Sequence, residues 1–212
     1  MRGCLITLEG GEGAGKSTVL NALSEHIEAA GIKLLVTREP GGTALGEAIR
    51  SVVLDGGIDQ VCAESELLLM FAARAQLVRE RIVPALSENT WVLSDRFTDA
   101  SFAYQGGGRG QPEERIADLE RWAAQGIRPD LTLLLDVPVA VGLARAQIRG
   151  EPDRIEREQA GFFDRVRSTY RERAKSEPSR FRIIDSSLDV GSVTASACAA
   201  VSEFIATRRN SA

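Results

Sequence analysis

The residues with the clearest chemical meaning lie in a glycine-rich segment near the start of the chain. Gly10 and Gly15, followed by Lys16 and Ser17, match the pattern G-x-x-x-x-G-K-[ST]. In such a loop, small residues let successive backbone N–H groups approach a phosphate, while the lysine reaches the outer phosphates and the hydroxyl reaches Mg²⁺. The pattern predicts a phosphate-binding loop formed by Gly10, Gly11, Glu12, Gly13, Ala14, Gly15, Lys16, Ser17 and Thr18.

The segments that flank this loop support phosphate binding. Apolar residues over 4–8 predict a buried strand, and apolar residues at helical spacing from Val19 to Ala30 predict a helix after the loop. The positive end of that helix adds attraction for an anion. A glycine-rich turn without a ligand is the alternative, and the Lys–Ser pair argues against it. A dinucleotide-binding pattern starting at Gly11 does not fit, because Lys16 stands where its last glycine belongs.

Two further predicted strands end in charged residues. The strand over 33–37 leads to Arg38, and the strand over 91–94 leads to Asp95 and Arg96. Because an open parallel sheet binds its ligands at the carboxyl ends of the strands, the two arginines are candidates for a second phosphate group. Asp95 closes an apolar strand, which is the usual place for a residue that serves Mg²⁺. The alternative for Arg38 is an ordinary solvated loop arginine.

A long apolar helix predicted over 63–89 contains an arginine within its apolar section. Arg74 follows Phe71 by three residues and lies on nearly the same helix face. A buried arginine needs an anion or an acceptor, so a bound ligand and a structural ion pair both remain open here. Pro84 is expected to kink or divide this helix.

Two glycine-containing segments are expected to interrupt helices. The glycines over 106–108 are expected to end a helix immediately after Tyr104. The Gly- and Pro-containing segment 149–154 lies between two predicted helices and predicts a mobile cationic lid over about 143–156. A salt-bridged surface is the alternative, because acidic residues are interleaved there. The candidate lid arginines are Arg145, Arg149 and Arg154.

The order of the elements predicts the fold class. Apolar strands alternate with helices along the whole chain, over 4–8, 33–37, 91–94, 131–136 and 181–185. This alternation predicts an α/β fold with a doubly wound, mainly parallel, five-stranded sheet flanked by helices. Because no internal repeat or linker is visible, residues 1–212 are expected to form a single domain.

The composition of the 212 residues narrows the class of protein. A formal net charge of −4 argues against a protein built to neutralise nucleic acid. The three cysteines are far apart and there is one histidine, so neither a cluster of metal ligands nor a Cys/His nucleophile pair is expected. We find no apolar signal segment and no apolar run judged long enough to cross a bilayer. These features predict a cytoplasmic protein that binds neither nucleic acid nor membrane.

Among proteins with such a phosphate loop, two classes fit poorly. A GTPase switch should contain N-K-x-D and D-x-x-G, but no Asn precedes a Lys and no Asp has a Gly three residues later. A large remodelling ATPase would need a longer chain with a partner-binding region. The arginines at strand ends and in the predicted lid favour a small-molecule phosphotransferase.

Six segments form a combination far more specific than the phosphate loop alone. They are Glu9–Thr18, Arg38–Thr43, Phe71–Arg74, Asp95–Arg96, Ala103–Arg109 and Gly150–Glu156. Together they resemble the bacterial thymidylate kinases. The resemblance implies a P-loop nucleoside-monophosphate-kinase fold with a short lid, phosphorylation of dTMP to dTDP by ATP with Mg²⁺, and a homodimer. Another nucleoside or nucleotide kinase, or a nucleotide-binding module whose catalysis has decayed, is the alternative.

The same resemblance implies how dTMP would be held. Phe71 would stack on thymine and Arg74 would face the O4 edge of the base. Tyr104 would lie against the deoxyribose, where a 2′-hydroxyl would clash. The remaining residues of the implied dTMP site are Ser101 and Gln105 near the base and Arg38 and Arg96 at the phosphate.

The resemblance also implies the phosphoryl-transfer residues. One branch of the family has an arginine inside the phosphate loop, and Gly13 stands at that place here. The chain therefore resembles the branch in which a lid arginine supplies the charge, with Arg149 as the first candidate and Arg145 or Arg154 as alternatives. Glu12 would approach the 3′-hydroxyl side of the sugar or help to organise the metal. The implied catalytic residues are Lys16, Arg96, Arg149, Asp95 and Glu12, with Ser17 and Asp95 as metal ligands and Arg145 near ATP.

Overall fold

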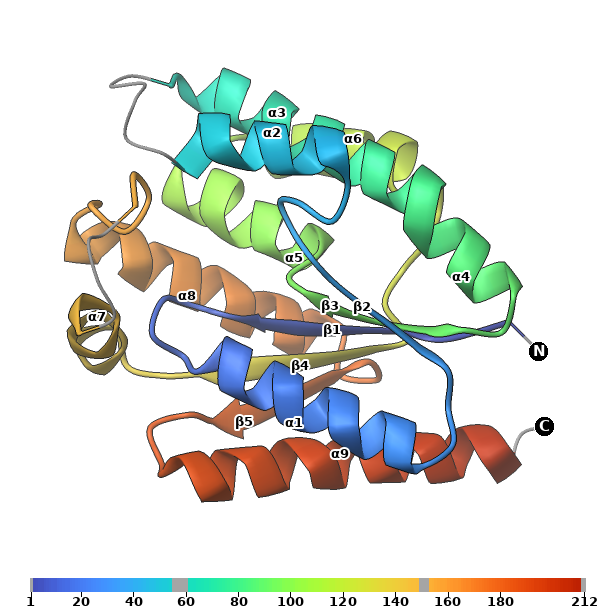
Figure 1. Cartoon of the computed structure of the whole chain (residues 1–212). Helices are drawn as coiled ribbons and strands as arrows, with labels where there is room; N and C mark the ends of the chain where they lie inside the picture. Colours follow the sequence, from blue (N-terminus) through green and yellow to red (C-terminus); the bar gives the residue numbers. More distant parts are fainter. Residues whose placement is uncertain (1, 55–60, 149–152, 211–212) are drawn as a thin grey trace.

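The computed structural model describes residues 2–54, 61–148 and 153–210, which are arranged around a parallel β-sheet (Figure 1). The five strands are paired in the order β2-β3-β1-β4-β5. All four neighbouring pairs are parallel. This arrangement confirms the predicted doubly wound sheet. The strands are β1 (Leu5–Gly10), β2 (Leu34–Arg38), β3 (Trp91–Asp95), β4 (Leu131–Asp136) and β5 (Phe181–Asp185).

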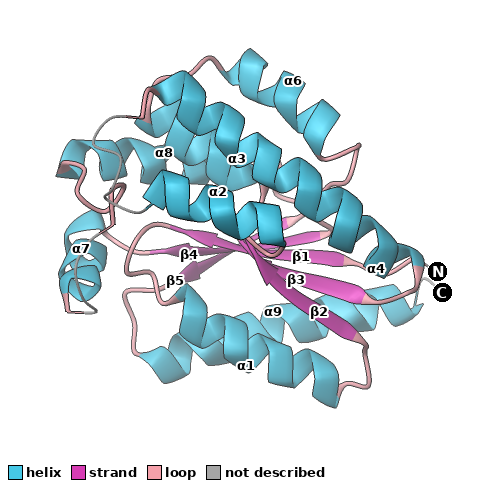
Figure 2. Cartoon of the chain, turned by 45° about the horizontal axis from the view of Figure 1, so that its top comes forward, coloured by secondary structure: helices cyan, strands magenta, loops and turns pink. Residues whose placement is uncertain are grey.

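Helices cover both faces of the sheet, as Figure 2 shows. One face carries α1 (Lys16–Ala29) and α9 (Val190–Asn210), and the other carries most of the remaining helices. All six residues of β1 are buried, because apolar side chains on both faces of a central strand meet a helix layer. The other helices discussed below are α2 (Ala44–Leu54), α3 (Ala63–Leu77), α6 (Glu113–Ala123), α7 (Val139–Gln147) and α8 (Ala160–Ser176).

The predicted division of the long helix at Pro84 is confirmed. After α3, the chain forms a wider π-helical turn, Val78–Ile82, before α4 (Val83–Ser87) begins. Pro84 lies in the first turn of α4. A proline there lacks an N–H for the preceding turn, so the helix changes its hydrogen-bond pattern at this point.

The predicted helix end immediately after Tyr104 is wrong. Helix α5 (Thr98–Ser101) continues as a π-helical segment, η2, over Phe102–Gly108, so the glycines belong to the helix. A Cβ atom on Gly107 would lie 2.1 Å from Oγ1 of Thr169, and one on Gly108 would lie 2.4 Å from the Phe162 ring. Both partners lie in α8, so the glycines serve close helix–helix packing rather than a helix end.

Helix α9 also departs from the expectation. Its best 18-residue window has a mean hydropathy of 1.3, so by length and composition alone it could cross a membrane, and the expectation that no segment would is wrong. Its buried face nevertheless packs into the core beneath the sheet, together with α1. The buried residues make up 22% of that window. The packed face consists of Val193, Ala197, Val201 and Ile205.

Candidate active site

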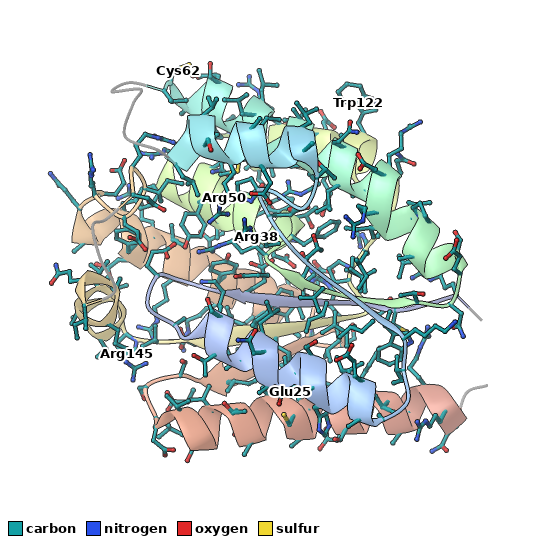
Figure 3. All side chains as sticks on the ribbon, in the orientation of Figure 1. Glu25, Arg38, Arg50, Cys62, Trp122 and Arg145 are labelled. Carbon is teal, nitrogen blue, oxygen red and sulfur yellow. The ribbon has the colours of Figure 1, made fainter. Side chains whose placement is uncertain are left out.

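A cleft of about 500 Å³ opens at the carboxyl ends of the strands. The phosphate loop forms one end of this cleft, and side chains from α2, α3 and the β3–α5 connection form the other. Figure 3 shows Arg38 and Arg50 in the space between α2 and the sheet, and Arg145 on α7. The lining residues used below are Glu12, Lys16, Ser17, Arg38, Glu39, Arg50, Met70, Arg74, Asp95, Arg96, Ser101, Tyr104, Gln105, Arg145, Leu188 and Val190.

The phosphate loop connects β1 to α1, as its sequence predicts. Gly13 and Gly15 have φ angles of 66° and 85°, values that favour glycine. The Nζ atom of Lys16 donates to the carbonyl oxygens of Gly10 (3.1 Å) and Gly11 (3.0 Å). Burial, followed by the charge of Arg96, lowers the pKa of Lys16. Glu12 through Thr18 line the cleft, whereas Gly10 and Gly11 shape the start of the loop.

Glu12 joins the phosphate loop to the far wall of the cleft. Its Oε1 accepts hydrogen bonds from Nη2 of Arg96 (2.7 Å) and from the hydroxyl of Tyr104 (2.8 Å). The Arg96 guanidinium also lies 4.7 Å from the centre of the Tyr104 ring. Burial works to lower the pKa of Arg96, but Tyr104 and Glu12 raise it well above its ordinary value. Burial raises the pKa of Tyr104, so a cationic arginine rests on a neutral phenol.

Asp95 ends β3 beside the phosphate loop. Its Oδ1 atom is buried and has no hydrogen-bond partner among the residues that the structure describes, although the side chain lines the cleft. The exposed Ser17 lines the same cleft. A carboxylate and a hydroxyl are the oxygen ligands that suit Mg²⁺, which also takes phosphates and waters. Within the described ranges no three His, Cys, Asp or Glu side chains could hold a metal ion together. The residues present therefore fit a nucleotide-bound Mg²⁺ rather than an all-protein metal cage.

Arg74 contacts three acceptors inside the protein. Its Nε donates to Oε2 of Glu39 (2.7 Å), and Nη1 donates to Oγ of Ser101 (2.9 Å). Its Nη2 donates to the carbonyl oxygen of Phe97 (3.1 Å). Burial raises the pKa of Glu39, while Arg74 lowers it. The ion-pair interpretation of Arg74 is therefore confirmed, and the same side chain also lines the cleft.

Comparison with known proteins settles the family. A sequence model of the thymidylate kinase family matches residues 8–197. The chain belongs to the thymidylate kinase family. It is 54% identical over 196 residues to a thymidylate kinase of Pseudomonas syringae pv. tomato, covering 92% of this chain and 93% of that one. It is 51% identical to one of Pseudomonas savastanoi pv. phaseolicola, covering 99% and 100%.

A solved structure gives the same result. The chain matches the crystal structure of thymidylate kinase from Ehrlichia chaffeensis with a TM-score of 0.78 and 29% identity, covering 95% of this chain and 99% of that one. The predicted fold and family are therefore confirmed. Membership makes the chain an enzyme that phosphorylates dTMP to dTDP, with ATP as the phosphoryl donor.

One residue expected to bind thymine lies elsewhere. Phe71 is 3% exposed and packs against Phe102 and Ile116 instead of lining the cleft. The Arg74 guanidinium covers its ring, 4.5 Å from the ring centre. Met70 from the same helix lines the cleft, and the stacking of Phe71 on thymine stays a prediction.

Ser101 and Gln105 do line the cleft, as expected of thymidylate kinases. The amide of Gln105 also donates from Nε2 to Oε1 of Glu66, at 2.9 Å. Glu66 is fully buried and pairs in addition with Arg109 and Arg154. The wall of the cleft that contains Ser101 and Gln105, here called the base-side wall, is thus hydrogen-bonded through Gln105 to a buried cluster of charged side chains.

Three arginines line the acceptor end of the cleft: Arg38, Arg50 and the Arg96 described above. Arg38 lines it as expected, while Nη2 of this residue donates to Oε2 of Glu47 (2.9 Å). Arg50 was not among the predicted site residues, yet it lines the cleft and donates from Nη1 to the carbonyl oxygen of Pro40 (3.0 Å). Burial lowers the pKa of Arg50. Its signal in the sequence was a cation next to Ile49, on the inward side of a helix.

The candidate lid arginines differ in position. Arg145 lines the cleft and donates to the carbonyl oxygens of Ser186 (2.7 Å) and Ser187 (3.3 Å). Arg154 donates to the carbonyl oxygen of Val53 (2.8 Å) and pairs with Glu66; it is not itself a lining residue, although its neighbours Asp153 and Ile155 are. Arg149 lies outside the described residues.

Proposed function

We propose that this cleft holds dTMP and ATP end to end and transfers the γ-phosphoryl group in line to the dTMP phosphate. The supporting observation is that one continuous cleft runs from the phosphate loop to Arg74, Ser101 and Tyr104. ATP phosphates occupy the loop from Gly10 to Thr18. The dTMP phosphate lies between the loop and the arginines of the acceptor end, Arg38, Arg50 and Arg96.

The chain's contribution to catalysis is positioning and charge neutralisation. The attacking dTMP phosphate is already an anion, so no strong general base is required, but two anions must be brought together. Lys16 and Arg96 supply positive charge at the point of transfer, and Glu12 orients Arg96. Ser17 and Asp95 would hold Mg²⁺, which would supply neutralisation of the phosphate charge. A well-aligned pair of reactants accounts for about 7–11 kcal/mol of the barrier.

The base-side wall sets the choice of acceptor. Arg74, Ser101 and Gln105 present donors to the carbonyl edges of thymine, whereas Tyr104 leaves no room for a 2′-hydroxyl. One methyl group separates dTMP from dUMP, which is worth about 1–3 kcal/mol, so dUMP is discriminated modestly. Cytosine would present an amino donor toward Arg74 and leave buried polar groups unpaired, so dCMP is rejected more strongly.

The remaining positive charge comes from the lid, which we place at about residues 143–156 of a single domain spanning 1–212. Arg149 is the first candidate for the catalytic lid arginine and Arg145 the alternative. Arg145 is supported by its place in the cleft, near Leu188 and Val190. Those two exposed apolar side chains offer a surface for adenine.

An acceptor panel tests the proposal. Release of ADP is measured with dTMP, dUMP, dCMP and TMP carrying a ribose, for wild type and for Arg149→Ala and Arg145→Ala. Removal of the catalytic lid arginine should lower turnover by about 10³–10⁵-fold, while ATP binding persists. Arg165, which donates to carbonyl oxygens of Gly107 and Gly108 and is not a lining residue, provides the control variant Arg165→Ala. Equal use of all acceptors would contradict the assigned base-side wall.

We further infer a cytoplasmic homodimer that binds neither nucleic acid nor membrane. Large apolar side chains are exposed on neighbouring helices: Leu68 of α3 is 58% exposed and Trp122 of α6 is 81% exposed. Leu45 and Val52 of α2 add to this surface. Sedimentation should give twice the chain mass, and Leu68→Glu should shift the protein toward the monomer. A wild-type monomer at micromolar concentration would refute the dimer.

A further inference from the structure

Arg96 adopts a backbone conformation that side-chain-bearing residues avoid. Its φ angle is 71°, in the left-handed region, which is unfavourable for a non-glycine residue. Its N–H donates to the carbonyl oxygen of Leu8 (3.0 Å), and its own carbonyl oxygen accepts from Oγ of Ser94 (2.7 Å). Such a conformation persists only where the surroundings hold it, and it is typical of functional sites.

Glu9 holds the other side of this backbone. The side chain is fully buried in β1 and does not line the cleft. Its Oε1 accepts a hydrogen bond of 2.8 Å from the N–H of Phe97, the residue directly after Arg96. The carboxyl therefore anchors the peptide through which the chain leaves the left-handed residue.

Glu9 also reaches the Arg96 side chain through one hydroxyl group. The hydroxyl of Tyr170 in α8 donates to Oε2 of Glu9 at 2.7 Å. The same oxygen of Tyr170 accepts a longer hydrogen bond from Nη1 of Arg96, at 3.4 Å. Nη1 of Arg96 further donates to the carbonyl oxygen of Gly10 in the phosphate loop, at 3.1 Å. One buried carboxyl is thus linked to both the backbone and the guanidinium of Arg96.

We propose that Glu9 is a positioning residue for dTMP phosphorylation, which presets Arg96 between the phosphate loop and the acceptor phosphate. This inference rests on the proposed role of Arg96 at the dTMP phosphate. Burying a carboxyl in a strand is unfavourable unless the group is hydrogen-bonded, and both of its oxygens are bonded to the Arg96 assembly. Burial, together with the charge of Asp99, raises the pKa of Glu9 to about 8, in keeping with an enclosed site.

The experiment compares the two substrates in Glu9→Ala and Glu9→Gln enzymes. A displacement of about 1 Å at a positioned group costs about 10²-fold in rate, so Glu9→Ala should lower kcat/KM for dTMP by about that factor. ATP affinity, measured by direct binding without acceptor, should change by less than about threefold. Glu9→Gln keeps an acceptor for Phe97 and should recover most of the activity.

The matched control is Thr7→Val, in the same buried strand. Thr7 shares a 2.9 Å hydrogen bond with Thr132 and does not contact Arg96. This variant should lose stability, but it should not lower kcat/KM for dTMP selectively relative to ATP affinity. If Glu9→Ala does not fold, Tyr170→Phe removes only the hydroxyl that joins Glu9 to Arg96, and it should lower kcat/KM for dTMP at least fivefold.

Arg96→Ala separates this inference from the proposed function. Loss of activity in Arg96→Ala with normal dTMP kinetics in both Glu9→Ala and Tyr170→Phe would overturn the positioning role alone. Near-normal activity in Arg96→Ala would overturn the proposed function of Arg96 itself. Equal losses for dTMP and ATP in Glu9→Ala would also overturn the inference, because they would indicate general structural damage.

Discussion

The phosphate loop packs closely on α7, and this contact can be tested by replacing single glycines with alanine. Gly13 and Gly142 form the contact, and Gly15 and Gly11 serve as controls. At Gly13 the φ angle is 66°, and a Cβ atom would lie 1.9 Å from the carbonyl oxygen of Gly142 in α7. At Gly142 a Cβ atom would lie 2.4 Å from the carbonyl oxygen of Glu12, without a positive φ angle. Gly15 has a φ angle of 85° but open space, and Gly11 has open space and no positive φ angle.

These positions separate backbone strain from steric overlap. Gly11→Ala should be neutral or stabilise by about 0.4–1 kcal/mol, because alanine restricts the unfolded chain. Gly15→Ala should cost about 1–2 kcal/mol from the left-handed backbone. In Gly142→Ala the overlap costs about 1–3 kcal/mol, and the better helix propensity of alanine offsets about 1 kcal/mol.

Gly13→Ala combines both penalties and should cost about 2–5 kcal/mol. For a domain of this size each kcal/mol lowers Tm by about 2–4 °C, so its Tm should fall by roughly 4–20 °C. The assay is thermal unfolding of the nucleotide-free protein, with urea unfolding for the free energies. If Gly13→Ala were no less stable than Gly15→Ala, which has the left-handed backbone without the overlap, the packing of the loop on α7 would be refuted. The same geometry leaves no room for a side chain at position 13 in this structure.

Three further predictions concern buried or unpaired charges. Glu9→Gln should flatten the dependence of Tm on pH. Burial raises the pKa of Glu9 from its ordinary 4.5 to about 8, so between these values the folded protein retains a proton that the unfolded chain releases. Wild-type stability therefore falls as the pH rises from about 4.5 to about 8, and the glutamine variant lacks this titration. Parallel Tm-against-pH curves would contradict this. Arg74→Met should destabilise by about 3–5 kcal/mol in urea unfolding, because Glu39 is left buried without a counter-ion, and adding Glu39→Gln should restore part of that loss. No recovery in the double variant would argue against the pair. Asp95→Asn should raise the Mg²⁺ concentration for half-maximal activity about 10–100-fold in a titration of turnover, and an unchanged curve would remove Asp95 from the metal site.

Local patterns in the sequence were sufficient to predict the strands and the phosphate loop that position the site. The apolar strands could be found because each is short and followed by turn residues, and the three central strands, β1, β3 and β4, are buried on both faces. Lys16, Asp95 and Arg96 could be placed at the cleft because a parallel sheet brings the ends of its strands to one edge. The phosphate loop depends on a contiguous segment, so its chemistry is visible without any knowledge of distant residues.

The contacts between segments that are distant in the sequence could not be predicted from local patterns. In the sequence, the glycines over 106–108 suggest the end of a helix. In the structure they lie within η2, and two of them allow α8 to pack closely against it. Phe71 lies beneath Arg74 and not in the cleft, because the helix packs that face on α6 and η2. Arg50 joins the cleft through the orientation of α2, which depends on tertiary packing.

The sequence by itself determined the parallel sheet, the phosphate loop and the set of cations near it, because these follow from short-range patterns of apolar, glycine and charged residues. Only the tertiary structure decided which side chain each of these groups contacts. Glu9 bonds to Tyr170 from 161 positions away, and no local pattern predicts such a partner. The physical reason is that a buried polar group must find its hydrogen-bond partner wherever packing brings one within reach.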